Sequence, residues 1–526
     1  MSTLVVMVGG CGNYLGSEVF AAIHTELRRA VSEGDNTTAD SLRRRFFTGD
    51  SMAACGDFLK ARSLLIDMEA KTVQNCLLRQ PLPINGERRG KCSAGRGIPK
   101  LNTGLTDPGW YWDPKFAYWK QGGCGNNWAL GHEFQGPSNR ESMEHLLLSL
   151  AEEGDSVSSI MVLHSLAGGT GSGVGSYLTE LCADLLPASC IASCCVWPFD
   201  AEAVPRKVGT VVLEALSDGI FIFENSRCAK ILQRHAMSSN TRTAAGLSEI
   251  NRCIARDLVG CCILPSYPWV PRSKNPSPGS SRQSNGPSGP QQVPSPAGRG
   301  VSERDAGVAL RCTMRDVLMA AAPHPAFKLL TCRYLPQGSL AEQNGVRFAP
   351  YTCTSLLHRL ERMFTRADTL DLLAPPSPST PSSHRQAFYA ATQQKSRDTP
   401  QHGTGRVGTH PNVAVGAQIC MRGPVVRSIE GDPTSACKIA LWPYALSSVQ
   451  YGCDYKLPHT LASSTERLCL LGAGCGRRTL QLGMDMLHAK AFVHHYERFG
   501  VGSEEIQNAL EQLQETANAY LTLRHN

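Results

Sequence analysis

Residues 163–173 combine glycine with hydroxyl side chains in a pattern that suits phosphate binding. The segment runs Leu-His-Ser-Leu-Ala-Gly-Gly-Thr-Gly-Ser-Gly, between an apolar run at Ile160–Leu163 and a helical pattern at Val174–Leu186. Glycine lets the backbone approach an anion and adopt positive φ, so that several N–H groups can converge on one phosphate. Thr170 and Ser172 add hydroxyl donors. The segment therefore predicts a phosphate-binding loop between a strand and a helix, whose N-terminus favours an anion.

A second glycine-rich segment lies close to the start of the chain. The apolar run Leu4–Val8 precedes Gly-Gly-Cys-Gly-Asn-Tyr-Leu-Gly at 9–16, and a helical pattern follows at Ser17–Leu27. Neither segment is a Walker A loop, because no lysine follows Gly173. A dinucleotide fingerprint is expected at the first strand and not deep in the chain. Two strand–loop–helix units in one chain can together hold a polyphosphate.

The elements that position these loops follow from the alternation of short apolar runs with helical periodicity. Residues 1–250 alternate in this way, which predicts a parallel α/β sheet. Residues 268–306 and 375–408 are rich in Pro, Ser, Gly and Gln, and we expect disordered insertions there because they cannot bury enough apolar surface. A final helix is predicted after Ser503, and we expect its apolar stripe to pack on its own domain. The stripe consists of Ile506, Leu510, Leu513, Ala517 and Leu521.

Several segments together resemble the tubulin family, and they occur in the family's order. They are Gly-Gly-Cys-Gly-Asn at 9–13, Ile-Asp-Met-Glu at 66–69, Gly-Asn-Asn-Trp-Ala at 125–129, Ala-Gly-Gly-Thr-Gly-Ser-Gly at 167–173, Pro-His-Pro at 323–325 and Ala-Lys-Ala-Phe-Val-His-His-Tyr at 489–496. The resemblance covers essentially the whole chain apart from insertions. Ala167, Pro-His-Pro and the pattern His-Tyr-x-x-Phe-Gly at 495–500 are most similar to the delta-tubulin branch of the family.

The resemblance implies an α/β fold with four parts. These are a parallel-sheet GTP-binding domain at 1–245, a core helix at 246–264, an intermediate α/β domain at 307–425 and a C-terminal helical domain with a helical hairpin at 426–526. It also implies a cytoplasmic, cytoskeletal protein of centrioles and basal bodies, with other tubulins or centriolar proteins as partners. GTP or GDP and Mg²⁺ are the implied cofactors, and GTP is favoured over ATP only through the resemblance.

The resemblance further implies which residues hold the nucleotide and the metal. Asp67 and Glu69 would bind Mg²⁺, because side chains two residues apart on a strand share one face. Asn225 and Asn251 would read guanine and ribose, because an amide both donates and accepts hydrogen bonds. The other expected contacts are Gly10, Cys11, Gly12, Asn126, Ser165, Ala167, Gly168, Gly169, Thr170, Gly171, Ser172 and Gly173.

Several residues depart from the family pattern. Gly10 and Tyr14 replace two glutamines of the first loop, and Leu247 replaces an aromatic residue that stacks on the base. The loss of stacking removes roughly 1–3 kcal/mol, so we expect weakened nucleotide binding. The chain ends Leu-Arg-His-Asn and lacks the usual run of glutamates, which removes a docking surface for motors. A specialised role is therefore favoured over the bulk microtubule lattice, and long homopolymers are not expected.

Hydrolysis would need a residue from a neighbouring subunit. Asp316 matches the acidic residue that orients water in trans in the family, whereas Thr313 replaces a companion acid one turn earlier. Two hypotheses remain: a structural GTP-binding protein, or a GTPase completed by Asp316. A third, a dinucleotide-dependent oxidoreductase, rests on the first glycine loop and on Glu33 or Asp35 as the ribose ligand.

Composition narrows the class of protein. The net charge of +7 is spread along the chain without a basic face, so nucleic-acid binding is not expected. No apolar run has the length of about 18 residues that a membrane span needs, and no secretory leader is evident. The 21 cysteines form no Cys-x-x-Cys pair and are expected to be reduced, with zinc at Cys190, Cys194 and Cys195 a weak alternative.

Overall fold

The computed structural model describes most of the N-terminal half of the chain and selected parts of the remainder. The described residues are 2–32, 34–48, 59–78, 109–154, 156–199, 216–238, 246–260, 267–268, 313–335, 363, 414–422, 447–452, 459–465, 487–490 and 493–522. Most of each expected insertion, at 268–306 and 375–408, lies outside the described residues. Residues 261–264 of the expected core helix and the last four residues of the chain also lie outside them.

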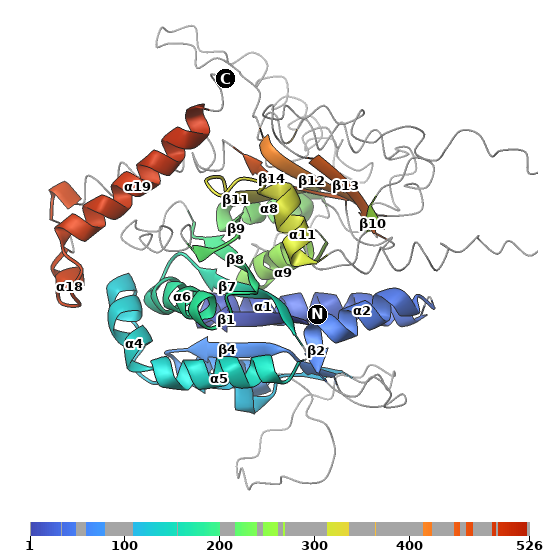
Figure 1. Ribbon diagram of the computed structural model, residues 1–526, viewed down its shortest axis with the longest axis horizontal. Helices are drawn as coiled ribbons and strands as arrows, with labels where there is room; N and C mark the ends of the chain where they lie inside the picture. The colour runs from blue at the N-terminus through green and yellow to red at the C-terminus, as the bar shows by residue number, and fades with distance from the viewer. Residues whose placement is uncertain are drawn as a thin grey trace, which may run out of the picture.

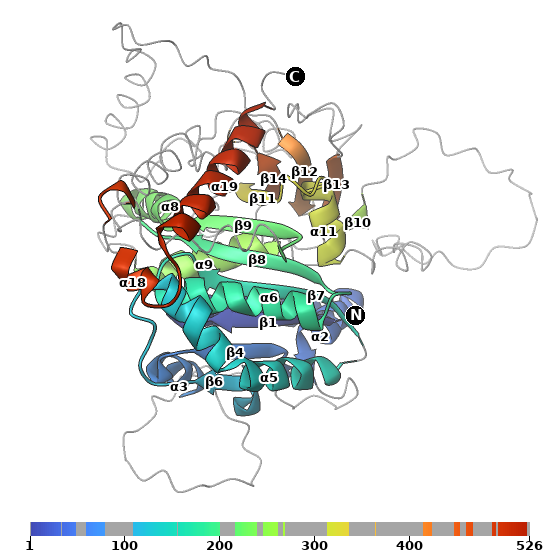
Figure 2. The same ribbon diagram turned by 60° about the vertical axis from the view of Figure 1, so that its left-hand side comes forward.

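An eleven-stranded sheet forms the centre of the molecule (Figures 1 and 2). Its order is β10-β13-β12-β14-β11-β9-β8-β7-β1-β4-β6, and every pair of neighbours from β11 to β6 is parallel. The predicted parallel α/β sheet is confirmed. Its strands are β1 Ser2–Val8, β4 Ser63–Asp67, β6 Ala117–Trp119, β7 Val157–Ser165, β8 Cys190–Trp197, β9 Gly219–Glu224 and β11 Leu329–Leu335.

The remaining strands extend this sheet on the β11 side. Strand β14 is antiparallel to β11 and to β12, whereas β13 is parallel to β12 and antiparallel to β10. Their bounds are β10 Tyr267–Pro268, β12 Ala414–Arg422, β13 Ser447–Gly452 and β14 His459–Thr465. Strands β13 and β14 lie within 426–526, which was expected to be helical. The expectation failed because such short strands are determined by pairing with distant neighbours and show little periodicity of their own.

Helices cover both faces of the parallel strands. Side chains alternate along each strand, so Val5 and Met7 of β1 pack with α1, α2, α8, α9 and α11, whereas Leu4, Val6 and Val8 pack with α5 and α6. The helices on the first face are α1 Gly9–Ser32, α2 Asn36–Phe46, α3 Ala70–Leu78, α8 Asn225–Ser238, α9 Leu247–Leu258 and α11 Met314–Ala321. Those on the second are α4 Gly136–Ser138, α5 Arg140–Glu152 and α6 Gly175–Leu185.

Short elements complete the N-terminal part of the chain. A three-stranded sheet, ordered β2-β3-β5, packs its aromatic residues against α1. Its strands are β2 Phe47–Thr48, β3 Leu59–Ala61 and β5 Trp110–Tyr111, and the helical turns are η1 Pro114–Phe116, η2 Leu130–Gln135 and η3 Thr170–Val174. None of the described helices combines the length and apolar character that crossing a bilayer requires.

The C-terminal helices are α18 Val493–Glu497 and α19 Ser503–Thr522. The end of α19 lies beside the β9 and β11 part of the sheet, whereas α18 lies near α4 and α6 (Figures 1 and 2). Tyr520 of α19 is fully buried against Phe327, with ring centroids 4.7 Å apart, and its hydroxyl accepts the backbone N–H of Leu329 at 3.1 Å. Leu513 and Ala517 are also buried, and Ile506 and Leu510 are partly buried, so the described part of the apolar stripe packs on its own chain as expected.

Candidate nucleotide-binding site

The site is formed where the chain changes direction across the sheet. Strand β1 lies between β4 and β7, so the connections after β1 and β7 leave the same edge of the sheet in opposite directions. In parallel sheets such a switch point leaves a crevice beyond the carboxyl ends of the strands. Both predicted glycine loops follow these two strands.

The first loop is the beginning of a helix. We expected a loop over 9–16 and a helix from Ser17, but α1 begins at Gly9, where φ is +72°. Positive φ at Gly9 provides the turn, so no separate loop is needed. The backbone N–H groups of Gly10, Cys11 and Gly12 lie in the first turn of α1, where amides have no partner within the helix. These amides and the helix dipole suit an anion.

The second loop meets the first directly. A Cβ atom on Gly9 would lie 2.9 Å from the backbone nitrogen of Gly171, and one on Gly12 would overlap the carbonyl oxygen of Leu163 in β7. Gly168 has φ +88°, and the chain then enters the η3 turn that leads into α6. Backbone amides of two segments about 160 residues apart therefore lie side by side, as a polyphosphate site requires.

The hydroxyl groups of the second loop bind the protein itself. Ser165 donates to the carbonyl oxygen of Ala167 at 2.6 Å, Ser172 donates to that of Gly168, and Thr170 lies 3.5 Å from the Cys124 sulfur. We expected these hydroxyls to be phosphate donors. In this conformation they hold the loop in shape, and their role as phosphate donors stays a prediction.

A third segment, residues 124–131, packs against the second loop. A Cβ atom on Gly169 would overlap Cys124 and lie 2.8 Å from the carbonyl oxygen of Asn127. Asn126 is exposed with φ +55°, and its side-chain oxygen would lie 3.9 Å from a Cβ atom on Gly168. The structure thus places Asn126 beside the loop at 167–173, and its contact with a nucleotide stays a prediction.

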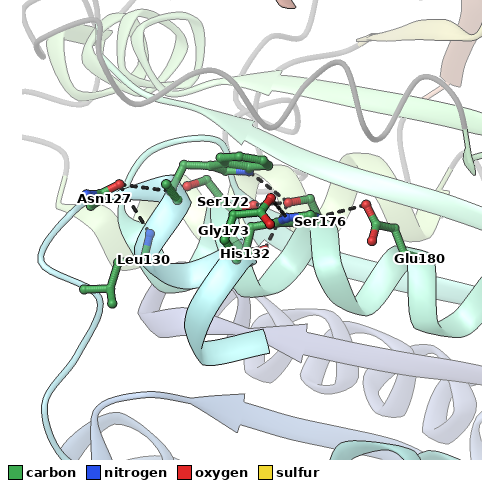
Figure 3. Close-up of polar contacts among 10 residues, drawn as sticks. Asn127, Leu130, His132, Ser172, Gly173, Ser176 and Glu180 are labelled. Atoms are coloured by element: carbon green, nitrogen blue, oxygen red, sulfur yellow. Dashed lines mark hydrogen bonds and ion pairs between the residues drawn. The ribbon is translucent and has the colours of Figure 1, made fainter. Parts of the chain in front are cut away.

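Polar contacts within residues 127–130 and between this segment and helix α6 fix its position (Figure 3). The Asn127 side-chain oxygen accepts the backbone N–H groups of Ala129 at 2.9 Å and Leu130 at 3.4 Å. The Trp128 indole donates to Ser176 at 2.9 Å, and Ser176 in turn donates to the carbonyl oxygens of Ser172 and Gly173. Sequence reasoning missed these supports, because only folding brings Trp128 and Ser176 together.

His132 completes the same network. Its ring stacks on Trp128 with centroids 4.5 Å apart, and its nitrogens lie 2.9 Å from Glu180 and 2.7 Å from Glu133 (Figure 3). Burial works to lower the pKa of His132, but the two carboxylates outweigh it and raise that pKa above its ordinary value. His132 therefore links the η2 turn, which continues from this segment, to α6.

The segment also contacts the C-terminal helices. The Asn127 side-chain amide donates to the carbonyl oxygen of His495 at 2.7 Å, and Trp128 packs with Tyr496 and Val501. One side of the segment thus faces the phosphate loop and the other faces α18.

The acidic pair differs from its expected geometry. Strand β4 ends at Asp67, so Asp67 and Glu69 do not share a strand face. Asp67 is only 3% exposed and accepts the backbone N–H of Glu69 at 3.2 Å, whereas Glu69 is exposed beside Gly123. Burial raises the pKa of Asp67 to about 6, against hydrogen bonds from Thr72 and the backbone that lower it. The two carboxylates remain at the edge of the sheet where the phosphate loops begin.

The two asparagines lie at the starts of neighbouring helices. Asn225 is half-buried and begins α8 directly after β9, and Asn251 is buried in the second turn of α9. Leu247 begins α9 and is 64% exposed. An apolar side chain so exposed, one turn before Asn251, fits a position that would face a bound base.

Asp316 has a structural partner in this chain. It is exposed at the third position of α11, and its carboxylate accepts the backbone N–H of Thr313 at 2.6 Å and the Thr313 hydroxyl at 2.9 Å. The two residues form a capping box that begins the helix. A role for Asp316 in hydrolysis stays a prediction.

Comparisons with known proteins decide the family. Residues 2–233 match the model described as "Tubulin/FtsZ family, GTPase domain". The chain is a divergent, delta-tubulin-like member of the tubulin superfamily. It is 24% identical to the tubulin delta chain of Canis lupus familiaris over 549 aligned positions and 25% identical to that of Mus musculus over 545. Both alignments cover 99% of this chain and all of the relative.

Tubulin epsilon chains match a shorter part of the chain. The tubulin epsilon chain of Mus musculus is 31% identical over 195 residues, which is 35% of each chain. A Tubulin/FtsZ GTPase domain implies that GTP or GDP is bound.

Two alternatives from the sequence lose their support. Cys190 and Cys194 point to one face of β8 and Cys195 to the other, and the described residues hold no cluster of His, Cys, Asp or Glu suited to a metal ion. Asp35, a proposed ribose ligand of an oxidoreductase, instead caps α2 by accepting the N–H of Thr38 at 3.0 Å. Glu33, the other candidate, lies outside the described residues.

Proposed function

We propose that the chain holds the phosphates of GTP or GDP between the first turn of α1 and the loop at 167–173. The contact between Gly9 and Gly171 carries this proposal, because it brings the first turn of α1 and the loop at 167–173 to one point, and the N-terminus of a helix favours an anion. Asn126 lies beside the same loop and would contact the terminal phosphate. Gly10 has no side chain, so backbone N–H groups would make the phosphate contacts on this side of the site.

Mg²⁺ would be held by Asp67 and Glu69 together with phosphate oxygens and water. Mg²⁺ usually takes one or two carboxylates from a protein and keeps several waters. Asp67 ends β4 beside α1, and Glu69 follows on the exposed side of the bend. Two carboxylates of this kind supply the negative charge that the metal needs, and the metal in turn would neutralise the phosphates.

The proposal is tested by nucleotide retention. We expect the full-length protein with Mg²⁺ to retain labelled GTP on a filter, and unlabelled GTP to compete far better than ATP. No retention at about 1 mM GTP, which corresponds to a binding free energy of only about −4 kcal/mol, would contradict it. Equal competition by ATP would leave phosphate binding intact but would remove the proposed roles of Asn225 and Asn251.

Replacement of Leu247 by tyrosine should strengthen nucleotide binding. An aromatic ring at this exposed position would stack on the base, which is worth roughly 1–3 kcal/mol, so GTP affinity should rise about 5- to 100-fold. Fluorescence titration with a labelled GTP analogue would measure the change. Met319→Tyr is the matched control, because Met319 is equally exposed on α11 and should leave GTP affinity unchanged. An unchanged affinity in Leu247→Tyr would place the base elsewhere.

The cellular role that fits best is that of a structural GTP-binding protein at centrioles and basal bodies, with other tubulins or centriolar proteins as partners. Likeness to delta-tubulins over the whole chain supports this proposal. Tagged full-length protein should co-localise with centriole markers and co-precipitate tubulin. A diffuse distribution without tubulin would contradict it.

A further inference from the structure

Two opposite charges are buried between α8 and α9. Asp257 of α9 is 0% exposed and Arg227 of α8 is 2% exposed, and the Arg227 Nη2 atom lies 3.8 Å from the Asp257 Oδ2 atom. Among the described residues, neither side chain has a hydrogen-bond partner. Removal of one member of a buried pair leaves an uncompensated charge, whereas replacement of both by apolar residues is often tolerated. The positions of the two helices and of the two charges therefore depend on one another.

The charges around the pair come from three elements. Asp257 faces Arg227, Arg256 of α9 at 3.9 Å, and Arg333 of β11. Burial, with the nearby Cys253 thiol, raises the pKa of Asp257, and the three arginines oppose that rise. On its other side, Arg227 faces Glu224, at the end of β9. The pair thus joins α8 to α9 and lies near charged side chains of β9 and β11.

The same two helices carry the asparagines of the proposed base site. Arg227 follows Asn225 by two residues in the first turn of α8, and Asp257 follows Asn251 by six residues in α9. A small relative shift of the helices would separate the two amides, and both must reach one bound nucleoside, made up of guanine and ribose. Hydrogen bonds of this kind weaken steeply with distance and angle.

We infer that Arg227 and Asp257 are positioning residues that set the spacing of Asn225 and Asn251 and thereby the recognition of the purine base. The inference rests on the proposed function, in which these asparagines read the base. The phosphate loops follow β1 and β7, whereas the pair joins α8, which follows β9, to the last turn of α9. Disturbing the pair should therefore weaken recognition of the base and spare recognition of the phosphates.

Comparison of GTP with inorganic tripolyphosphate tests this inference on the full chain. In Asp257→Asn we expect GTP affinity to fall about 10-fold or more, while tripolyphosphate affinity changes by less than about 2-fold. In the double variant Arg227→Met with Asp257→Leu, neither member of the pair is left as a buried charge without the other, and GTP affinity should return to within about 3-fold of the wild type. Equal losses for both ligands, or a double variant no better than the single one, would overturn the inference.

A second buried pair provides the control. Glu26 and Arg29 lie 2.8 Å apart in α1, and each side chain is 6% exposed. Glu26→Gln should lower stability without changing the ratio of GTP to tripolyphosphate affinity. Should Asp257→Asn not fold, Arg227→Lys keeps the positive charge and takes its place, with the same selective loss expected and the same equal losses contradicting it. A wild-type protein that binds tripolyphosphate but not GTP would refute the proposed base site itself.

Discussion

Replacement of Gly12 by alanine is expected to disrupt the nucleotide site and much of the stability of the domain. A Cβ atom at residue 12 would overlap the carbonyl oxygen of Leu163, which belongs to the β7 backbone and cannot rotate away. Helix α1 would have to move off the sheet, and its first turn would leave the loop at 167–173. Overpacking typically costs about 1–3 kcal/mol, and an overlap with a strand backbone should cost about 3 kcal/mol; the displacement should lower GTP affinity by about two orders of magnitude.

Gly10→Ala is the matched control in the same turn of the same helix. Its Cβ atom would lie 3.8 Å from the Thr72 hydroxyl, which is an ordinary contact. Alanine favours a helix by about 1 kcal/mol over glycine, so the melting temperature should stay the same or rise. Thermal unfolding and GTP titration on both variants would check the pair of outcomes. Similar melting temperatures for Gly12→Ala and wild type would show that α1 does not pack on β7 as described.

The loops were predictable because their chemistry is local. Glycine at 168 and 169 with hydroxyls at 170 and 172 requires a backbone that approaches an anion, and the apolar runs around them predict a strand and a helix. The same residues did not show whether the Ser172 hydroxyl would donate to a phosphate or to the carbonyl oxygen of Gly168 in its own loop, because a hydroxyl suits both acceptors. The sequence also gave no reason to begin α1 at Gly9, since a run of glycines disfavours a helix except where the first turn needs close approach.

Features that depend on contacts between distant segments were missed. Arg227 and Asp257 each look like surface residues in the sequence, and only the packing of α8 on α9 makes them a buried pair. Strands β13 and β14 likewise require β12 as a partner before they can form. The bounds proposed for the separate domains stay predictions. The described strands join into one sheet through the parallel contact of β11 with β9, at a point where the sequence placed a domain boundary.

Asp67→Asn should stabilise the protein without nucleotide and weaken its binding of Mg²⁺ and GTP. The pKa of Asp67 is raised to about 6 in the folded protein from an ordinary value of 3.8. The folded state therefore binds this proton more tightly than the unfolded chain, and stability falls as the pH rises from about 4 through 6. Asparagine removes the buried charge and can still accept the N–H of Glu69. We expect a gain of up to about 3 kcal/mol at pH 7.5 and little gain near pH 4.

Nucleotide binding should change in the opposite direction, because Mg²⁺ needs the ionised carboxylate that the fold disfavours. We expect the Mg²⁺ dependence of GTP binding to weaken by about 10- to 100-fold in Asp67→Asn. In the wild type, Mg²⁺-supported GTP binding should rise between about pH 5 and pH 7, as Asp67 ionises, and the variant should lose this rise. Glu69→Gln is the control, because Glu69 is exposed and its replacement should not stabilise the nucleotide-free protein. A stability gain equal at pH 4 and pH 7.5, or an unaltered pH profile of GTP binding, would show that Asp67 neither carries the buried charge nor serves the metal.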